Sequence, residues 1–115
     1  MKVYSGYRHE AGNTASRVTV IVDGHSLSEG FQYVNHSPDG FNWGYAGSGP
    51  SQLAFAIMHD YFKGQGLTPK EAYEKVIGGL YQEFKFDFVA HWSNQWQITE
   101  EEITNWLKEK VNERD

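Results

Sequence analysis

The sequence predicts a single α+β domain, residues 1–115, in which a small antiparallel N-terminal sheet of about three to four strands packs with about three helices. Three observations support this prediction. Short alternating or β-branched runs, separated by turn residues, fill the first third of the chain. Apolar residues recur with helical spacing through much of the remainder. The length of 115 residues fits one domain with a core of its own.

The N-terminal segment is expected to form a meander of short strands. Residues 3–8 read as a first strand, and residues 17–22, with the run Val-Thr-Val-Ile-Val, carry the strongest strand signal in the chain. A polar turn at residues 9–16 separates them. Asp23-Gly24 then predicts a type I′ hairpin, because both central residues of that turn need positive φ. Return strands are expected at residues 25–28 and 31–35.

A first helix is expected over residues 50–63. Pro50 suits the first helical position, because the N–H that proline lacks would have no partner there anyway. Gly64 is the expected stop at the other end. The apolar residues spaced for one wide face of this helix are Leu53, Ala54, Ile57, Met58, Tyr61 and Phe62.

A second helix is expected to begin at a capping box, in which Thr68 caps the first turn and Glu71 reaches back to the cap residue. Gly78-Gly79 weakens the helix by about 1 kcal/mol per glycine relative to alanine, so a kink or a close packing contact is expected there. Beyond this point Phe84, Phe86 and Phe88 alternate with polar residues, which leaves a strand open as an alternative.

The last helix is expected to begin at a second capping box, formed by Thr99 and Glu102. Its polar residues predict a solvated face. The residues expected to face the core are Ile103, Trp106, Leu107 and Val111.

Composition argues against several classes of function. The net charge is −5 and no run of Lys or Arg occurs, so we expect no nucleic-acid partner, since DNA and RNA require a basic surface. The chain has no cysteine, which excludes disulfides, thiolate metal sites and cysteine nucleophiles. No stretch approaches the roughly 20 apolar residues of a membrane helix, and no signal peptide is evident. We therefore expect no membrane partner and a cytoplasmic location, the host cytoplasm if the chain is viral.

The most unusual stretch is an aromatic, glycine-rich segment at residues 35–52. Pro38-Asp39-Gly40 predicts a turn within it. Phe41, Trp43 and Tyr45 then alternate, so their rings are expected to share one face of an extended segment. Glycines at positions 44, 47 and 49 permit close approach of a backbone or a ligand.

This segment leads into the first helix, whose N-terminus offers partial positive charge and free N–H groups to a phosphate or carboxylate. Flat rings beside that anion site would stack on a base or another planar group. The predicted ligand-binding residues are Asn35, His36, Ser37, Trp43, Tyr45, Ser48, Gly49, Ser51 and Gln52, with Arg8 and Lys85 offsetting the acidic charge of the chain. The alternative is structural: ordinary helix capping, core aromatics, and surface charges at Arg8 and Lys85.

Known phosphate and nucleophile motifs do not match this segment. A P-loop is excluded because Pro50 follows Gly49 where a lysine is required. A dinucleotide fingerprint would need a third glycine at Gln52. A nucleophile elbow around Ser48 would need glycines at the positions that Ala46 and Pro50 occupy.

The central segment resembles the signature NHSPxGFxWGYxGSGPxQLA of an uncharacterised family of small proteins found in bacteria, archaea and their viruses. The matching blocks are Asn35-His36-Ser37-Pro38, Gly40-Phe41, Trp43-Gly44-Tyr45, Gly47-Ser48-Gly49-Pro50 and Gln52-Leu53-Ala54. Weaker matches extend the resemblance over most of the chain: Val22-Asp23-Gly24, Phe84-Lys85, Trp96, Ile98-Thr99 and Trp106-Leu107. Residues 67–79 depart from it as an insertion-like stretch, which would alter the mouth of a pocket or a subunit contact.

The resemblance implies no activity, because the family has none assigned. It suggests a context, since small orphan proteins shared by prokaryotes and phages are often anti-defence proteins. One such strategy is a sponge, a catalytically inert protein that sequesters a nucleotide immune signal. The primary hypothesis is therefore non-catalytic binding of a small phosphorylated or nucleotide-like ligand, with Trp43 and Tyr45 stacking on its planar part and no cofactor.

Two other classes of function stay open. An aromatic-rich surface would also suit an interaction or oligomerisation module with no small ligand, and a homo-oligomer is expected in either case. An enzyme is the least favoured reading. The five histidines have no metal-like spacing, and no paired carboxylates suggest an acid and a base. His36 and Ser37 are adjacent and would point apart in an extended chain. His59 reads as a satisfied helix residue.

Overall fold

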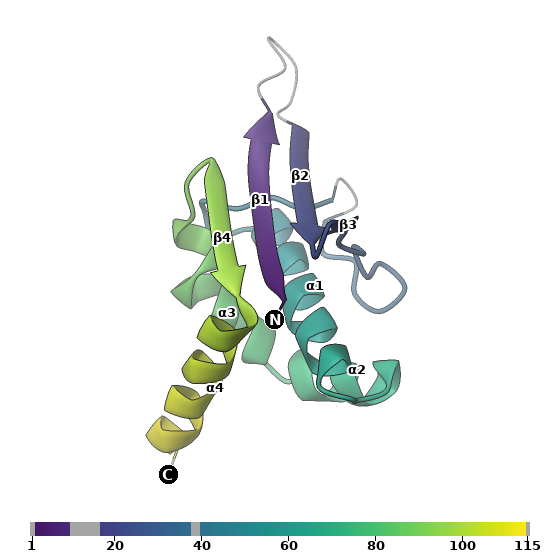
Figure 1. The fold of residues 1–115 in the computed structure, drawn as a ribbon, viewed down its shortest axis with the longest axis vertical. Helices are drawn as coiled ribbons and strands as arrows, with labels where there is room; N and C mark the ends of the chain where they lie inside the picture. Colours follow the sequence, from purple (N-terminus) through teal and green to yellow (C-terminus); the bar gives the residue numbers. More distant parts are fainter. Residues whose placement is uncertain (1, 10–16, 38–39, 115) are drawn as a thin grey trace.

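The computed structural model describes residues 2–9, 17–37 and 40–114, with side-chain surroundings described for residues 2–9, 18–37 and 40–110. Within these residues the fold is α+β, as predicted, with one four-stranded antiparallel sheet and four α-helices (Figure 1). The turns expected at residues 9–16 and at Pro38-Asp39 lie largely outside the described residues.

The first three strands form the predicted meander. They are β1 (Val3–His9), β2 (Arg17–Val22) and β3 (His25–Ser26). The hairpin between β2 and β3 is confirmed, because Asp23 and Gly24 have φ of 49° and 83°. The return strand is shorter than expected. Residues 31–35 do not form a strand: the N–H groups of Tyr33 and Val34 both donate to the carbonyl of Gly30, which closes a turn.

The fourth strand, β4 (Gln95–Thr99), comes from the C-terminal part of the chain and was not predicted. It pairs with β1, so that the sheet order is β3-β2-β1-β4 and β4 forms an edge (Figure 1). Trp96 and Ile98 are buried while Gln95 and Gln97 are exposed, which is the alternation of a half-buried strand. The signal is present in the sequence but covers only five residues.

The central helix α1 (Ser48–Gly64) is buried along most of its length. It begins two residues earlier than expected, so Pro50 is its third residue rather than its first. It also ends differently. The left-handed residue is Gly66, with φ of 97°, and not Gly64. Gly66 donates to the carbonyl of Lys63 and Leu67 to that of Phe62, the paired bonds of a Schellman motif.

The Gly78-Gly79 pair ends one helix and starts the next, α2 (Pro69–Ile77) and α3 (Leu80–Asp87). Gly79 has φ of 116°, a conformation that favours glycine, so the interruption is complete rather than a kink. The capping box of Thr68 and Glu71 is confirmed by both of its hydrogen bonds. The phenylalanines at positions 84, 86 and 88 belong to α3 and its C-cap, which rules out the strand alternative.

The last helix, α4 (Glu100–Arg114), follows a short 3-10 turn η1 (Val89–His91) and β4. Its predicted capping box is confirmed by hydrogen bonds between Thr99 and Glu102 in both directions. Ile103 and Trp106 are buried and Leu107 is partly buried, as expected. The side-chain surroundings of Val111 lie outside the description. No helix within the described residues is long and apolar enough to cross a membrane.

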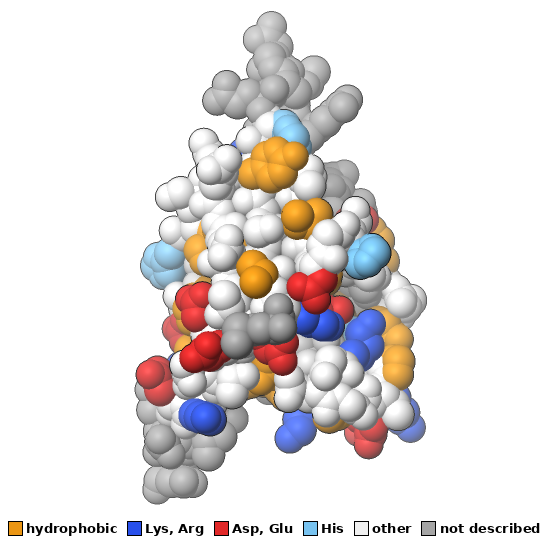
Figure 2. All heavy atoms as spheres, viewed as in Figure 1, with side chains coloured by type: hydrophobic (Ala, Val, Ile, Leu, Met, Phe, Trp, Pro, Cys, Tyr) orange, Lys and Arg blue, Asp and Glu red, His pale blue; other side chains and the backbone are white. Residues whose placement is uncertain are grey.

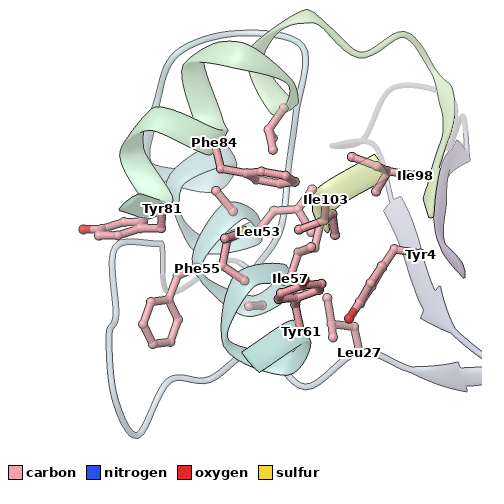
Figure 3. Close-up of a cluster of buried hydrophobic side chains, with 14 of the residues drawn as sticks. Tyr4, Leu27, Leu53, Phe55, Ile57, Tyr61, Tyr81, Phe84, Ile98 and Ile103 are labelled. Carbon is pink, nitrogen blue, oxygen red and sulfur yellow. The ribbon is translucent and has the colours of Figure 1, made fainter. Parts of the chain in front are cut away.

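The helices lie behind the sheet, and the core forms between the two layers. Figure 3 shows side chains of β1, α1, α3, β4 and α4 meeting there, among them Tyr4, Leu53, Phe84 and Ile98. The opposite face of the sheet has no helix across it in the described residues (Figure 1). Figure 2 shows that face with only scattered hydrophobic side chains. The site predicted at the start of α1 therefore lies in the helical layer.

Candidate functional site

Trp43 lies in the core and not on the surface predicted for a stacking ring. Its exposed fraction is 1%, its Nε1–H donates to the carbonyl of Ser93 at 2.7 Å, and its ring meets that of Trp96 edge-on. Tyr45 is 49% exposed, so the two rings do not share one face. The alternation fails because Gly44, with φ of 88°, turns the chain and donates its N–H to the carbonyl of Val89. The stacking role predicted for Trp43 is wrong for this arrangement.

Arg8 holds the aromatic loop in place and does not face open surface. Its Nη2 donates to Asn42 Oδ1 at 2.8 Å and to the carbonyl of Trp43 at 2.9 Å, and its Nη1 donates to Asn94 Oδ1 at 2.8 Å. The guanidinium carbon also lies 5.0 Å from the centroid of the Trp43 ring. These contacts join β1 to the loop before α1 and to the loop before β4. Arg8 is therefore assigned a structural role in place of the predicted ligand contact.

Gln52 is likewise structural, although it was predicted to bind ligand. Its side chain is fully buried and every one of its polar atoms is used. Oε1 accepts from the amides of His36 at 2.8 Å and Ser37 at 3.4 Å. Nε2 donates to the carbonyls of Glu29 at 2.7 Å and Val34 at 2.8 Å. One glutamine thus satisfies the irregular backbone at residues 29–37, which has no strand partner to do so.

The loop that Gln52 holds carries three further predicted site residues. Asn35 is exposed, and Ser37 is buried beside Gln52. His36 is exposed, with its Nε2 2.7 Å from the hydroxyl oxygen of Tyr81 on α3. Figure 3 shows that hydroxyl pointing away from the core. Tyr81 was missed in the sequence, although it lies one helical turn before Lys85 and therefore on the same side of α3.

Lys85 was considered as a surface charge, but its exposed fraction is only 7%. Its Nζ donates to the hydroxyl of Ser51 at 3.2 Å and lies 4.3 Å from the centroid of the Phe86 ring. Among the described residues it has no carboxylate partner, whereas Lys2 and Lys110 both form ion pairs. Two of its three N–H donors therefore have no acceptor in the described part of the chain.

Ser51 belongs to the first turn of α1, where several of the predicted ligand-binding residues lie. The N-cap, Gly47, supplies no side-chain cap, and no acidic residue occupies the first turn. The amides of Ser48 and Gly49 have no hydrogen-bond acceptor among the described residues, as expected for the start of a helix. Ser48 is exposed, whereas Gly49 is buried, with Asn42 and the Tyr45 hydroxyl close against it. An anion would therefore approach along the Ser48–Ser51 side.

Phe86 is the second residue that sequence reasoning missed. It is 54% exposed, the largest exposed fraction among the large hydrophobic side chains in the described residues. Its ring lies against the ammonium of Lys85, so a planar surface is present at the charged end of α3. In the sequence, Phe86 lies on the polar side of a helix, which would have indicated an exposed ring. This indication was missed because residues 84–88 were also open to interpretation as a strand.

A concave region lies beside the start of α2. A groove of about 610 Å³ is lined by Tyr33, Thr68, Pro69, Lys70, Tyr73 and Glu74, so the insertion-like stretch at residues 67–79 forms one wall of it. His59 lies beneath, with its Nε2–H donating to the carbonyl of Pro69. Burial lowers the pKa of His59 below its ordinary value. The interpretation of His59 as a satisfied helix residue is confirmed.

No group of three or more His, Asp or Glu side chains in the described part of the chain is arranged to hold a metal ion. The arrangement around Lys85 is instead suited to one chemical task. It places a cation, the hydroxyl of Ser51 and the exposed ring of Phe86 in contact at the first turn of α1, which are elements that an anion site with a stacking surface would need.

Comparison with known proteins adds one finding. A model of a family described as "Family of unknown function (DUF6166)" matches residues 4–109. No curated protein matches the chain, and no solved structure matches it.

Proposed function

The chain belongs to DUF6166, a family of unknown function, and we propose that it binds a small phosphorylated or nucleotide-like ligand without transforming it. The observation that carries this proposal is the ammonium of Lys85, which is buried and lacks a carboxylate partner among the described residues. The remaining groups of the site support the same chemistry.

A buried charge is costly unless another group compensates it, and buried lysines are normally paired. A single serine hydroxyl is a weak partner for an ammonium, because it carries no formal negative charge. A phosphate or carboxylate at the same place would accept the remaining N–H donors and neutralise the charge. The unbalanced cation is therefore what a site for an anionic ligand would contain before the ligand binds.

The groups at the start of α1, where Ser51 contacts Lys85, would suit a tetrahedral oxyanion. The hydroxyls of Ser48 and Ser51 and the amides of Ser48 and Gly49 are hydrogen-bond partners at the positive end of the α1 dipole. Tyr45, half-exposed next to the same turn, offers a ring to the uncharged part of the ligand. Asn35 and His36 offer polar contacts on the neighbouring loop.

The test is a calorimetric titration of the purified protein with inorganic phosphate and, separately, with adenosine 5′-monophosphate. Lys85→Met should weaken both affinities by about tenfold or more, because a hydrogen bond to a charged group contributes roughly 1.5–3 kcal/mol. The matched control is Lys108→Met, which removes an exposed lysine from α4 and should leave binding unchanged. Absence of binding by the unaltered protein would refute the proposal.

Sequestration of a nucleotide signal in the cytoplasm is the biological role that we propose for such a binder. The anti-defence sponge suggested by the family's distribution is one form of it. Native mass spectrometry of protein purified from cells, with identification of any released small molecule, would name the ligand class. A stoichiometric anion that contains no planar group would argue against a nucleotide signal.

A second candidate function, self-association, is favoured by the open edge of β4. Arg8 N–H donates to the carbonyl of Asn94 and Glu100 N–H to that of Lys2, so in this antiparallel ladder Trp96 and Ile98 also bond toward β1. Gln95 and Gln97 therefore direct their backbone groups outward, on a strand with no charged residue. Glu102 occupies the N–H of Thr99 and limits the edge at that end.

We propose a second copy as the occupant of this edge, paired antiparallel about Gln97. That register places Trp96 opposite Ile98 of the other copy, an aromatic and β-branched pair, and keeps the acidic starts of the two α4 helices apart. Gln97→Pro removes the outward N–H and should convert a dimer to a monomer in light scattering, while Gln97→Ala keeps it and should not. If the unaltered protein is monomeric at all concentrations, pairing through the β4 edge is excluded.

A further inference from the structure

Besides Ser51, the ammonium of Lys85 contacts the ring of Phe86. Lys85 Nζ lies 4.3 Å from the centroid of the Phe86 ring, within the range of a cation–π interaction. More than half of Phe86 is nevertheless exposed, although it is a large apolar residue on a surface helix. One side of the ring thus meets the cation, and the exposed remainder is open to solvent.

We infer that Phe86 determines the ligand class of the Lys85 site, which is a phosphate that carries an aromatic base, such as a nucleoside monophosphate. The inference rests on the proposed function, because it concerns the same site. The phosphate binds at Lys85 and Ser51, and the base stacks on the exposed face of Phe86. Phe86 thereby takes the role that the sequence had suggested for Trp43.

Charge alone would not distinguish among phosphates. Inorganic phosphate, a sugar phosphate and a nucleotide all bring oxygens that accept hydrogen bonds from Lys85, Ser51 and the first amides of α1 equally well. A planar base adds contact area only if a flat ring lies beside the anion site, and base–aromatic stacking then strengthens binding by a term that the other two ligands lack. In the described structure, the ring in contact with the ammonium is Phe86.

The position of Phe86 also links the two parts of the ligand. Because the ring already touches the ammonium, an anion held by Lys85 and a base held by Phe86 would lie within one small molecule's length of each other. The ammonium occupies one side of the Phe86 ring, so it does not compete with a base that stacks on the other side. A ligand without a base would leave that apolar surface exposed to water.

The experiment compares two probes that differ only in the base, adenosine 5′-monophosphate and ribose 5-phosphate, with inorganic phosphate as a third. Calorimetry of the unaltered protein should give an affinity for the nucleotide about tenfold above that for ribose 5-phosphate. Phe86→Ala should bring this ratio close to one while leaving the affinity for ribose 5-phosphate nearly unchanged. Phe86→Trp, which keeps a ring, should retain the preference.

Tyr7→Ala is the matched control, since Tyr7 is also exposed but lies on β1, and its loss should not alter the ratio. Thermal unfolding establishes that each variant is folded. If the unaltered protein binds all three probes with one affinity, or if Phe86→Ala keeps the preference, the inference is overturned while phosphate binding stands. If the unaltered protein binds none of the probes, the proposed function itself fails.

Discussion

Gln52 and Lys85 are two buried polar residues on the facing helices α1 and α3, and they differ in how completely their side chains are satisfied. Gln52 makes four hydrogen bonds, all to backbone groups of residues 29–37. Lys85 carries a full charge and has one neutral hydrogen-bond partner and one ring in contact with it. Both were predicted to bind ligand, and the structure separates them.

The difference shows which kind of burial indicates function. A polar side chain whose hydrogen bonds are all made stabilises the fold. It gains nothing from a ligand, because it has no unused donor or acceptor. An unsatisfied charge lowers stability, and a fold that retains it has a use for it elsewhere. Replacing Gln52 should therefore lower the stability of the fold. Replacing Lys85 should leave stability unchanged or raise it, and should weaken ligand binding.

The largest expected effect is on stability at Gln52. Gln52→Ala leaves two amides and two carbonyls of the 29–37 loop without partners and opens a cavity beside α1, so the free energy of unfolding should fall by about 3 kcal/mol. Urea unfolding followed by tryptophan fluorescence measures it. Gln65→Ala, which removes an exposed glutamine at the end of α1, should cost less than about 0.5 kcal/mol. Equal losses for the two variants would mean that the four hydrogen bonds of Gln52 do not stabilise the fold more than an exposed glutamine does.

A smaller effect of opposite sign is expected at Lys85. Lys85→Met keeps the volume of the side chain but removes the buried charge, so the free energy of unfolding should stay constant or rise by about 1 kcal/mol. The same urea titration, in phosphate-free buffer, checks this. A loss of more than about 1 kcal/mol would mean that the ammonium is compensated within the chain, and the case for an anionic ligand would lapse.

The smallest effect concerns Asp87, a partly exposed carboxylate on α3 that is fully paired. Burial acts to raise its pKa, but hydrogen bonds from Trp106 Nε1 and Lys110 outweigh it, so that the pKa is lowered from its ordinary value of 3.8. A lowered pKa means that the stabilisation is complete above the unfolded value and is lost as the pH falls below it. Acid unfolding followed by tryptophan fluorescence should show this dependence below about pH 3.8.

Asp87→Asn supplies the control for that titration. It keeps a hydrogen-bond acceptor for Trp106 but removes the titrating group, so the part of the acid transition that belongs to Asp87 should disappear. If the variant and the unaltered protein lose stability over the same pH range by the same amount, Asp87 does not contribute.

The parts of the fold that sequence reasoning recovered are local ones. The Asp23-Gly24 hairpin and the capping boxes at Thr68 and Thr99 depend on residues within three or four positions of each other. The strand β4 was missed because five residues of alternation are a weak signal until β1 is there to pair with them. The end of α1 was misplaced because Gly64 and Gly66 are equally good stops by sequence.

The contacts of the predicted site residues agree with the sequence prediction in part. The segment at residues 35–52 does approach Lys85 through Ser51, as its glycines and serines suggested. Trp43 and Arg8, in contrast, serve the packing of the loop. Phe86 and Tyr81 of α3 were not predicted, and they contact Lys85 and His36 respectively. No local pattern could tell a buried tryptophan from an exposed one, because burial depends on which elements meet.

The sequence by itself determined the class of fold, the Asp23-Gly24 hairpin, the capping boxes that start α2 and α4, and the acidic net charge, since each follows from neighbouring residues or from composition. Tertiary structure alone decided that β4 completes the sheet, that Trp43 is core, and that Lys85 is buried beside Ser51. These depend on contacts between residues far apart in the chain: Lys85 and Ser51 are 34 positions apart, and β1 and β4 come from opposite ends of the sequence. Such contacts are selected by the packing of the whole core, which no short stretch of sequence contains.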